Sequence, residues 1–250
     1  MSVLSIHRLS LSRGGHAIAG SLDMRIEAGK VTVVLGPNGA GKSSLLLAMA
    51  GMLASDVGHI GLQGRDIRTL SRRQIAESLT WQGDLPPTDF GLTVRQRLEL
   101  AVREVSSKAL EQIAGTLDIG HILMRRLGEL SAGERQRIEL AAVLLRDTPV
   151  ALLDEPTAHL DLRHQSVWLA LMRRQADAGR AVVAVLHDVQ QAACVADTVL
   201  FVYGDGRVEH GEARDMLTPL RLEALFHMPV LHLQNGRLIV PDYRSGIEAA

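Results

Sequence analysis

The sequence is poor in cysteine and in aromatic residues. One cysteine, Cys194, occurs in 250 residues, and aromatic residues make up 3% of the chain. A lone cysteine excludes an internal disulfide and any metal site built from several cysteines. No aromatic residue precedes Trp81, so that part of the chain offers no ring on which a ligand could stack.

Net charge and long apolar runs are also lacking. The formal net charge is −1, which gives no electrostatic argument for binding nucleic acid or an anionic membrane. The apolar run at 181–186 is far too short to span a bilayer. No basic amino-terminal stretch leads into an apolar one, so we expect no signal peptide. These absences favour a soluble, cytoplasmic protein with one large α/β core, with or without a smaller insert.

Residues 36–43 have the pattern of a phosphate-binding loop. The loop and the residue after it read Gly36, Pro37, Asn38, Gly39, Ala40, Gly41, Lys42, Ser43 and Ser44. An apolar run at 31–35 precedes the loop and predicts a buried parallel strand, and a helical stretch that ends at Gly51 follows it. The alternative is a glycine-rich turn that binds nothing, and the flanking strand and helix argue against it.

Each residue type in this loop has a role in holding phosphate. The glycines let backbone N–H groups close around phosphate oxygens without a Cβ in the way. Lys42 offers a mobile charge for the β- and γ-phosphates, and the Ser43 hydroxyl is a ligand for magnesium. The loop therefore predicts a nucleotide-binding protein.

Polar residues follow two further apolar runs. The run at 149–153 ends in Asp154 and Glu155, at the sheet edge where open α/β folds bind ligands. In a phosphate-loop protein, Asp154 belongs to the magnesium shell and Glu155 is placed to polarise a water. The run at 181–186 delivers His187 to the same edge. A solvated strand end and an ordinary surface histidine are the alternatives.

The remaining pattern predicts three structural parts. Alternating apolar residues before position 28 indicate an antiparallel β subdomain with one wet face. The pattern of residues 93–128 predicts helix, with Val94, Leu98, Ala101 and Val102 on one face. We expect an α/β fold: a phosphate-loop NTPase core with a mostly parallel sheet and the antiparallel β subdomain at 1–85 and 146–250, and a helical insert at 86–145.

Taken together, these motifs resemble the nucleotide-binding subunits of ATP-binding cassette (ABC) transporters over nearly the whole chain, 1–250. In chain order they are the phosphate loop at 36–43, Q-loop Gln82, the signature at 130–134, Asp154 with Glu155, the D-loop at 158–161 and switch His187. Ser131 and Glu134 also have capping-box spacing, so the signature taken alone fits a well-capped helix equally well.

The resemblance implies that ATP and Mg²⁺ bind at these motifs. Lys42 and the loop amides would hold the phosphates and assist catalysis. Ser43, Gln82 and Asp154 would hold the magnesium ion. Arg13 stands where family members usually offer an aromatic ring to adenine, and its guanidinium plane is the expected substitute.

The resemblance also implies a head-to-tail homodimer with two ATP molecules between the copies. Ser131 and Gly133 of the opposite copy would cap the γ-phosphate, and Asp161 would link the two sites. Glu155 would activate the attacking water, which His187 would position. The signature departs from the family pattern at Ala132, which replaces a glycine, so we expect a less close cap.

The family's other partners follow from the resemblance as well. We expect integral membrane permease subunits docked on the helical insert and the loop at 82–88, an indirect link to a substrate-binding protein, and a peripheral location on the cytoplasmic face of the inner membrane.

The stretches at 156–165 and 217–219 are similar to the cobalamin, iron-siderophore and haem importers, and Pro86 with Pro87 looks closer to the cobalamin subunits. A soluble ABC ATPase acting on nucleic acid or ribosomes is the alternative, but the chain has neither a second cassette nor a long coiled-coil insert. We expect no binding of nucleic acid.

Overall fold

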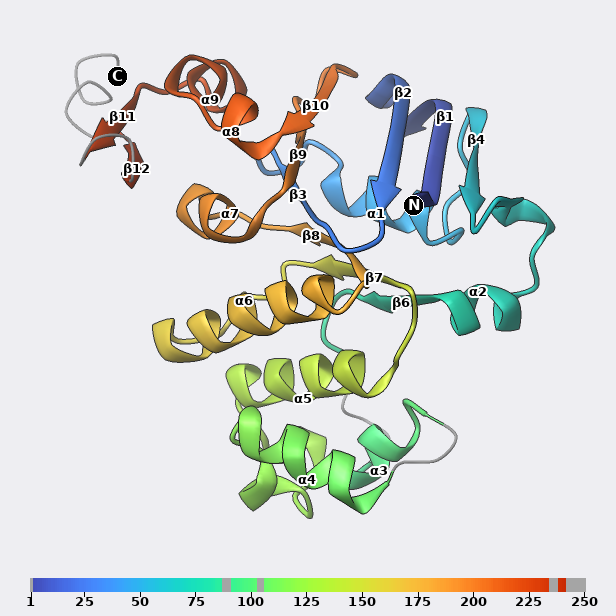
Figure 1. Cartoon of the computed structure of the whole chain (residues 1–250), viewed down its shortest axis with the longest axis vertical. Coiled ribbons are helices and arrows are strands. Elements are labelled where there is room, and N and C mark those ends of the chain that lie inside the picture. Colours follow the sequence, from blue (N-terminus) through green and yellow to red (C-terminus); the bar gives the residue numbers. More distant parts are fainter. Residues whose placement is uncertain (1, 87–90, 103–105, 234–237, 242–250) are drawn as a thin grey trace.

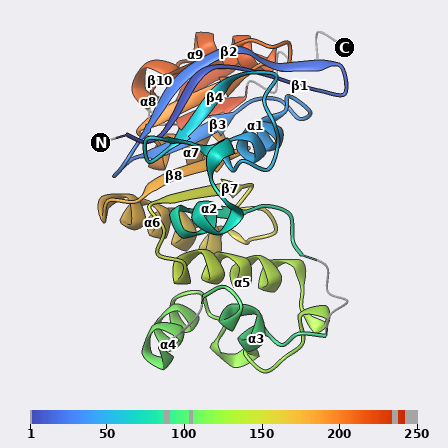
Figure 2. The ribbon, with the colours of Figure 1, turned by 90° about the vertical axis from the view of Figure 1, so that its right-hand side faces the viewer.

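The computed structural model describes residues 2–86, 91–102, 106–233 and 238–241. Two sheets lie in one half of the molecule, and helices α3, α4 and α5 lie in the other half (Figures 1 and 2). Pro87 and Thr88, the last two residues of the expected permease-docking loop at 82–88, lie outside the described residues. Within the described residues, no helix combines the length and the apolar character needed to cross a bilayer.

The first sheet is antiparallel, as its alternating sequence predicts. Its strand order is β2-β1-β4-β5. The strands are β1 (Ser2–Arg13), β2 (His16–Glu27), β4 (Val57–Leu62) and β5 (Arg65–Asp66). In β2, Leu22, Met24 and Ile26 are buried, whereas the residues between them are exposed. One face therefore packs on the core and the other faces solvent.

The second sheet carries the expected parallel core. Its order is β10-β9-β3-β8-β7-β6, and all neighbours are parallel except the hairpin pair β9 and β10. The strands are β3 (Val31–Leu35), β6 (Leu79–Gln82), β7 (Val150–Asp154), β8 (Ala181–Val185), β9 (Thr198–Val202) and β10 (Val208–Glu212). Because β3, β6, β7 and β8 run in parallel, the residues that follow them meet at one sheet edge.

Alternate residues of the central strands enter two different core clusters. Val33 packs with the helices on one face of the sheet, including α5 (Ala132–Leu145) and α6 (Leu162–Asp177). Val34 packs on the opposite face with α1 (Lys42–Met49) and the antiparallel sheet. Because both faces of the parallel sheet are covered, all five residues of β3 are buried.

The helical region is more broken than the sequence pattern predicts. It contains α3 (Val94–Glu99), α4 (Ser107–Thr116) and two 3-10 turns at Gly120–Ile122 and Leu127–Glu129. Val94 and Leu98 are buried as expected. The prediction that Ala101 and Val102 continue the same helix is wrong, because the Ala101 N–H bonds to the Leu98 carbonyl in a tight turn beyond the end of α3. The boundary of the insert at 86–145 stays a prediction.

The other helices are short and peripheral. They are α2 (Arg72–Ser78), α7 (Val189–Val195), α8 (Ala213–Met216) and α9 (Pro219–Phe226). The chain closes with the small antiparallel pair β11 (Val230–Leu233) and β12 (Leu238–Pro241). This pair lies beside α9, far from the helical half (Figure 1). The tail is thus part of the scaffold beside the parallel sheet.

Candidate functional site

The loop between β3 and α1 has the backbone that phosphate binding requires. Gly39 and Gly41 lie at φ 80° and 94°, in the left-handed region that favours glycine. Gly41 directly precedes α1, so backbone N–H groups at the start of that helix face the loop. Position 36 requires glycine because of close packing: an added Cβ would lie 2.1 Å from the Val202 carbonyl oxygen.

Lys42 is held inside this loop. Its Nζ donates to the carbonyls of Gly36 and Pro37, each at 2.8 Å, and the residue is 6% exposed. Burial lowers the pKa of the ammonium group, although nearby Glu155 and Asp154 oppose the shift. No ion pair within 4.0 Å neutralises Lys42 among the described residues. A cation held by carbonyls alone is ready to bind an anion.

A cavity of about 690 Å³ opens over the loop. It is lined by Asn38, Gly39, Gly41, Lys42, Ser43, Ser44, Glu155 and His187. We call it the phosphate cavity. The cavity lies between the first turn of α1 and the residues that follow β7 and β8. This is the position expected where parallel strands end at one edge of a sheet.

Glu155 and His187 face each other at the rim of the phosphate cavity. Glu155 Oε1 lies 2.6 Å from His187 Nε2, and both side chains are nearly half exposed, at 44% and 45%. Glu155 has φ 49°, a left-handed conformation that residues with a Cβ rarely adopt. Such strain occurs where a side chain must point in one direction. Here it turns a carboxylate toward a histidine beside the phosphate loop.

Three oxygen-bearing side chains converge beside the loop. Ser43, Gln82 and Asp154 line a smaller cavity of about 130 Å³. Gln82 Oε1 and Asp154 Oδ1 are both buried and have no hydrogen-bond partner among the residues that the structure describes, whereas the Ser43 side chain hydrogen-bonds to Asp154. Burial raises the pKa of Asp154. Buried oxygens without donors fit a hard cation such as Mg²⁺, which supplies the missing positive charge.

Arg13 reaches the same region from the end of β1. Its Nη1 donates to Ser44 Oγ at 3.1 Å, and Ser44 lines the phosphate cavity. The guanidinium therefore lies beside the first turn of α1. Its predicted stacking on adenine stays a prediction.

The signature residues line a different cavity. Ser131 caps α5 and forms the predicted capping box with Glu134, so the structural interpretation of this pair is confirmed. With the D-loop they enclose about 470 Å³; the lining residues are Ser131, Ala132, Gly133, Glu134, Arg137, His159, Leu160, Asp161 and His164. We call it the signature cavity. It shares no lining residue with the phosphate cavity.

The structure therefore brings together part of the predicted set. Lys42, Ser43, Ser44, Glu155 and His187 surround one cavity, with Gln82 and Asp154 beside it and Arg13 in contact. Ser131, Gly133 and Asp161 lie apart from them within one copy of the chain.

Sequence reasoning missed three residues near these cavities. Gln136 lines the Asp154 cavity and donates to the Pro156 carbonyl at 2.9 Å. Arg137 and His164 line the signature cavity. The available signal was helical spacing, because His164 lies three positions after Asp161 and Arg137 lies four after Gly133.

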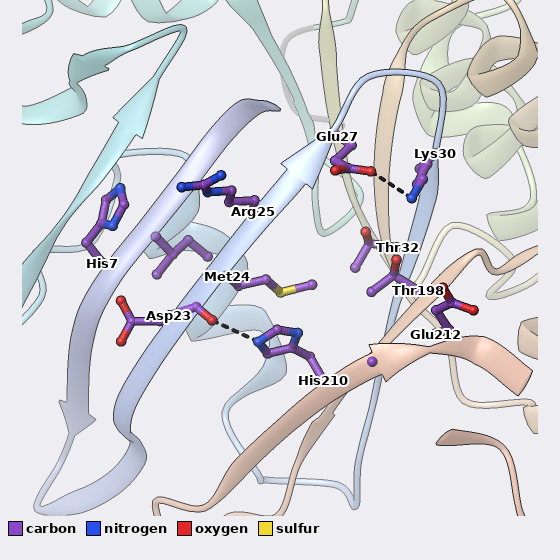
Figure 3. Close-up of a pocket in the computed structure, with 12 residues that line it drawn as sticks. His7, Asp23, Met24, Arg25, Glu27, Lys30, Thr32, Thr198, His210 and Glu212 are labelled. Atoms are coloured by element: carbon purple, nitrogen blue, oxygen red, sulfur yellow. Dashed lines mark hydrogen bonds and ion pairs between the residues drawn. The ribbon is translucent and has the colours of Figure 1, made fainter. Parts of the chain in front are cut away.

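A further cavity of about 500 Å³ lies between the two sheets, away from the phosphate loop (Figure 3). Lys30, Thr32 and Thr198 line it, so it borders the amino-terminal ends of β3 and β9 rather than their carboxyl ends. Several of its polar groups pair with one another: His210 Nε2 lies 2.8 Å from the Asp23 carbonyl, and Lys30 lies 2.7 Å from Glu27. It is separate from the candidate nucleotide site.

Comparisons with known proteins agree with this geometry. The chain is 34% identical to the hemin import ATP-binding protein of Pseudomonas entomophila, over 95% of this chain and 99% of that protein. It is 36% identical to the protein of the same name from Bordetella pertussis, over 95% and 98% of the two chains.

A solved structure agrees as well. It is described as a metal-chelate type ABC transporter in an inward-facing conformation, and it matches with a TM-score of 0.82 at 25% identity, covering 98% of this chain and 99% of that one. The sequence model of the ABC transporter family matches residues 20–158, a stretch that includes the phosphate loop, Gln82, the signature and Glu155. With whole-length relatives, and with the phosphate loop, Gln82, Asp154, Glu155 and His187 gathered at one sheet edge, this chain belongs to the ABC transporter family as an ATP-binding ATPase subunit.

Proposed function

We propose that this chain is the energy-coupling subunit of an importer for haem or a related metal chelate. The observation that carries the ATPase part is the phosphate cavity, where the Lys42 cation faces the pair Glu155 and His187. The hemin import names of the relatives and the metal-chelate transporter of similar fold support the substrate class. They favour the haem branch of the sequence expectation, and cobalamin stays a prediction.

Hydrolysis follows from the placement of these groups. The triphosphate lies along the loop amides, and the Lys42 ammonium turns from the carbonyls of Gly36 and Pro37 to the phosphate oxygens. The Glu155 carboxylate accepts a proton from the attacking water as the water oxygen bonds to the γ-phosphorus. The bond from that phosphorus to the β–γ bridging oxygen breaks, and ADP leaves. His187 faces Glu155 and positions the attacking water at the γ-phosphate. These steps need no covalent intermediate with the protein.

The metal site belongs to the same proposal. Ser43, Gln82 and Asp154 would hold Mg²⁺, which supplies positive charge to the β- and γ-phosphates when bound. The two orphaned oxygens, Gln82 Oε1 and Asp154 Oδ1, support this assignment.

Two copies of the chain are needed to complete the site. Ser131, Gly133 and Asp161 line a cavity of their own, so one copy cannot place them on its own bound nucleotide. A head-to-tail dimer brings the signature cavity of one copy to the phosphate cavity of the other. Each of the two ATP molecules is then held by both copies.

We also propose the membrane partner that the family requires. The helical half exposes Leu100 and Met124, at 70% and 75% exposure, and a docked permease would cover such apolar side chains. An integral permease would bind there and place this subunit peripherally on the cytoplasmic face of the inner membrane. A substrate-binding protein would act through that permease. No observation favours the alternative of a soluble ATPase acting on nucleic acid or ribosomes.

The variant Glu155→Gln tests the catalytic assignment. It keeps the shape of the side chain but removes the base, so we expect ATP hydrolysis to fall by about a thousandfold or more and an ATP-bound dimer to accumulate. Phosphate release and size-exclusion chromatography measure the two effects. The control is Glu77→Gln, an exposed acid on α2 paired with Arg73. Hydrolysis at the wild-type rate would remove Glu155 from its role as the base.

Purification from native cells tests the transporter assignment. The tagged chain, extracted in mild detergent, should bring down a stoichiometric integral membrane protein, and haem should stimulate hydrolysis once the binding protein is added. Recovery of ribosomes or nucleic acid with no membrane partner would contradict the proposal.

A further inference from the structure

Arg137, His164 and Asp161 form a hydrogen-bonded chain along the wall of the signature cavity. His164 Nδ1 lies 2.8 Å from Asp161 Oδ1, and Arg137 Nη1 lies 3.4 Å from His164 Nε2. Arg137 belongs to α5, and Asp161 is the D-loop residue that caps α6. The chain of contacts therefore joins the signature helix to the D-loop.

The two partners determine which nitrogen of His164 carries the proton. A carboxylate such as Asp161 accepts hydrogen bonds, and the Arg137 guanidinium donates them. The His164 ring must therefore donate from Nδ1 and accept at Nε2. Both ring nitrogens of His164 have a partner. Rotating the ring, or substituting His164, would therefore break the contact with Asp161, the contact with Arg137, or both.

Arg137 extends the chain of contacts to a third helix. The two N–H bonds of its Nη1 point to the carbonyls of Leu117 at 2.9 Å and Asp118 at 2.6 Å, so the longer contact with His164 Nε2 shares one of these hydrogens. These carbonyls close the carboxyl end of α4, where a cation is favoured by the helix dipole. Arg137 is 9% exposed. Since α5 lies between α6 and α4 (Figure 1), the chain of contacts crosses the stack of three helices.

Helix capping does not explain the ring of His164. Asp161 Oδ1 already accepts the backbone N–H of His164 at 2.8 Å, which caps α6 whatever the side chain is. The ring adds a second bond to the same carboxylate oxygen. The D-loop also packs closely on α5, because a Cβ added at Gly133 would lie 2.7 Å from the His159 carbonyl oxygen.

We propose that His164 is a positioning residue that holds Asp161 and the signature turn in one fixed arrangement. This inference rests on the proposed two-copy function, in which both elements meet the partner copy. The Asp161 side chain is 65% exposed, so the ring restricts its rotamers before the partner arrives. A copy that presents both elements together closes on ATP without the entropic cost of ordering them separately.

The test is a set of substitutions at His164. In His164→Ala we expect kcat to fall about tenfold and the ATP-dependent dimer, measured in the Glu155→Gln background, to weaken by a similar factor. The KM for ATP should change by less than about twofold, because no residue of the phosphate cavity is altered. His164→Asn keeps a donor near the position of Nδ1 and should restore part of both losses. Ser166→Ala, an exposed position on the same helix, is the matched control.

The outcomes separate this inference from the proposed function. If the wild-type chain neither hydrolyses ATP nor dimerises with it, the proposed function fails. If the wild type does both and His164→Ala does both equally well, the positioning role alone is overturned. It is also overturned if His164→Asn, folded with an unchanged unfolding midpoint, is no better than His164→Ala, because Asp161 would then not be the partner that matters.

Discussion

Single side chains set the charge balance of the nucleotide site. Lys42 is a buried cation that donates to two carbonyls, and Asp154 is an acid whose Oδ1 has no partner in the part of the chain that the structure describes. Within that part, neither group has a partner of opposite charge at contact distance. Such groups are costly in a folded protein and occur where a ligand completes them. Nucleotide and magnesium should therefore stabilise the fold at these two residues.

Arg13 should contribute to nucleotide affinity. Its guanidinium donates to Ser44 beside the phosphate cavity, so it adds positive charge where the nucleotide enters. We expect Arg13→Ala to raise the KM for ATP severalfold with little change in kcat, measured by steady-state hydrolysis. Arg25→Ala, an exposed arginine on the neighbouring strand, should leave KM unchanged. An unchanged KM in Arg13→Ala would remove Arg13 from the site.

Asp154→Asn should stabilise the metal-free protein. Burial raises the pKa of Asp154, so at neutral pH the folded state holds a charge that the unfolded state would hold more easily. The penalty is fully present above the raised pKa and is lost as the pH falls below the ordinary value for Asp. We expect a higher unfolding midpoint for Asp154→Asn in chelator, by calorimetry, together with loss of Mg²⁺-dependent hydrolysis. A lower midpoint in chelator would show that the charge is compensated.

At the scale of elements, close packing against both sheets restricts the backbone of the phosphate loop. Gly36 directly follows β3 and meets the backbone of β9, and Gly41 meets the side chain of Ile18 in β2. The loop is therefore held between the two sheets. This prepares the N–H groups before a nucleotide binds, which lowers the entropic cost of binding.

Gly36→Ala should destabilise the fold even without ligand. The new Cβ would lie 2.1 Å from the Val202 carbonyl oxygen, and backbone must move to relieve the overlap, at a cost of about 1–3 kcal/mol. Gly39→Ala is the matched control: a Cβ there meets nothing within 4 Å, so only its left-handed φ is penalised, by about 1 kcal/mol. Urea unfolding measures both. Equal costs would contradict the packing argument.

At the scale of the whole molecule, the phosphate cavity and the signature cavity lie apart from each other. One copy presents a phosphate cavity and a signature cavity with no lining residue in common. In a head-to-tail pair the phosphate cavity of each copy meets the signature cavity of the other, so the same contact forms twice, as in a closed two-fold assembly. Activity should therefore depend on protein concentration at low concentration.

Mixing two inactive variants should restore activity. Lys42→Ala removes the phosphate contact, and Ser131→Arg blocks the signature cavity, so each homodimer has two defective sites. A mixed dimer regenerates one intact site from the Lys42 of one copy and the Ser131 of the other. With random mixing about a quarter of all sites are intact, and hydrolysis in the mixture should rise accordingly above either variant alone. No recovery, with mixed dimers shown by a tag, would contradict the head-to-tail arrangement.

The sequence by itself determined the sheet types, the phosphate loop and the strand-end residues. These depend on local periodicity and on the rule that parallel strands end at one edge, so chain order suffices to place Asp154, Glu155 and His187 near Lys42. The break after α3 escaped the pattern, because helix ends depend on local turns that periodicity does not record. Only the tertiary structure decided that Gln82 Oε1 and Asp154 Oδ1 are left without partners among the described residues, and that His164 joins Arg137 to Asp161. Those facts depend on segments far apart in the chain, whose distances are set by how helices and sheets pack.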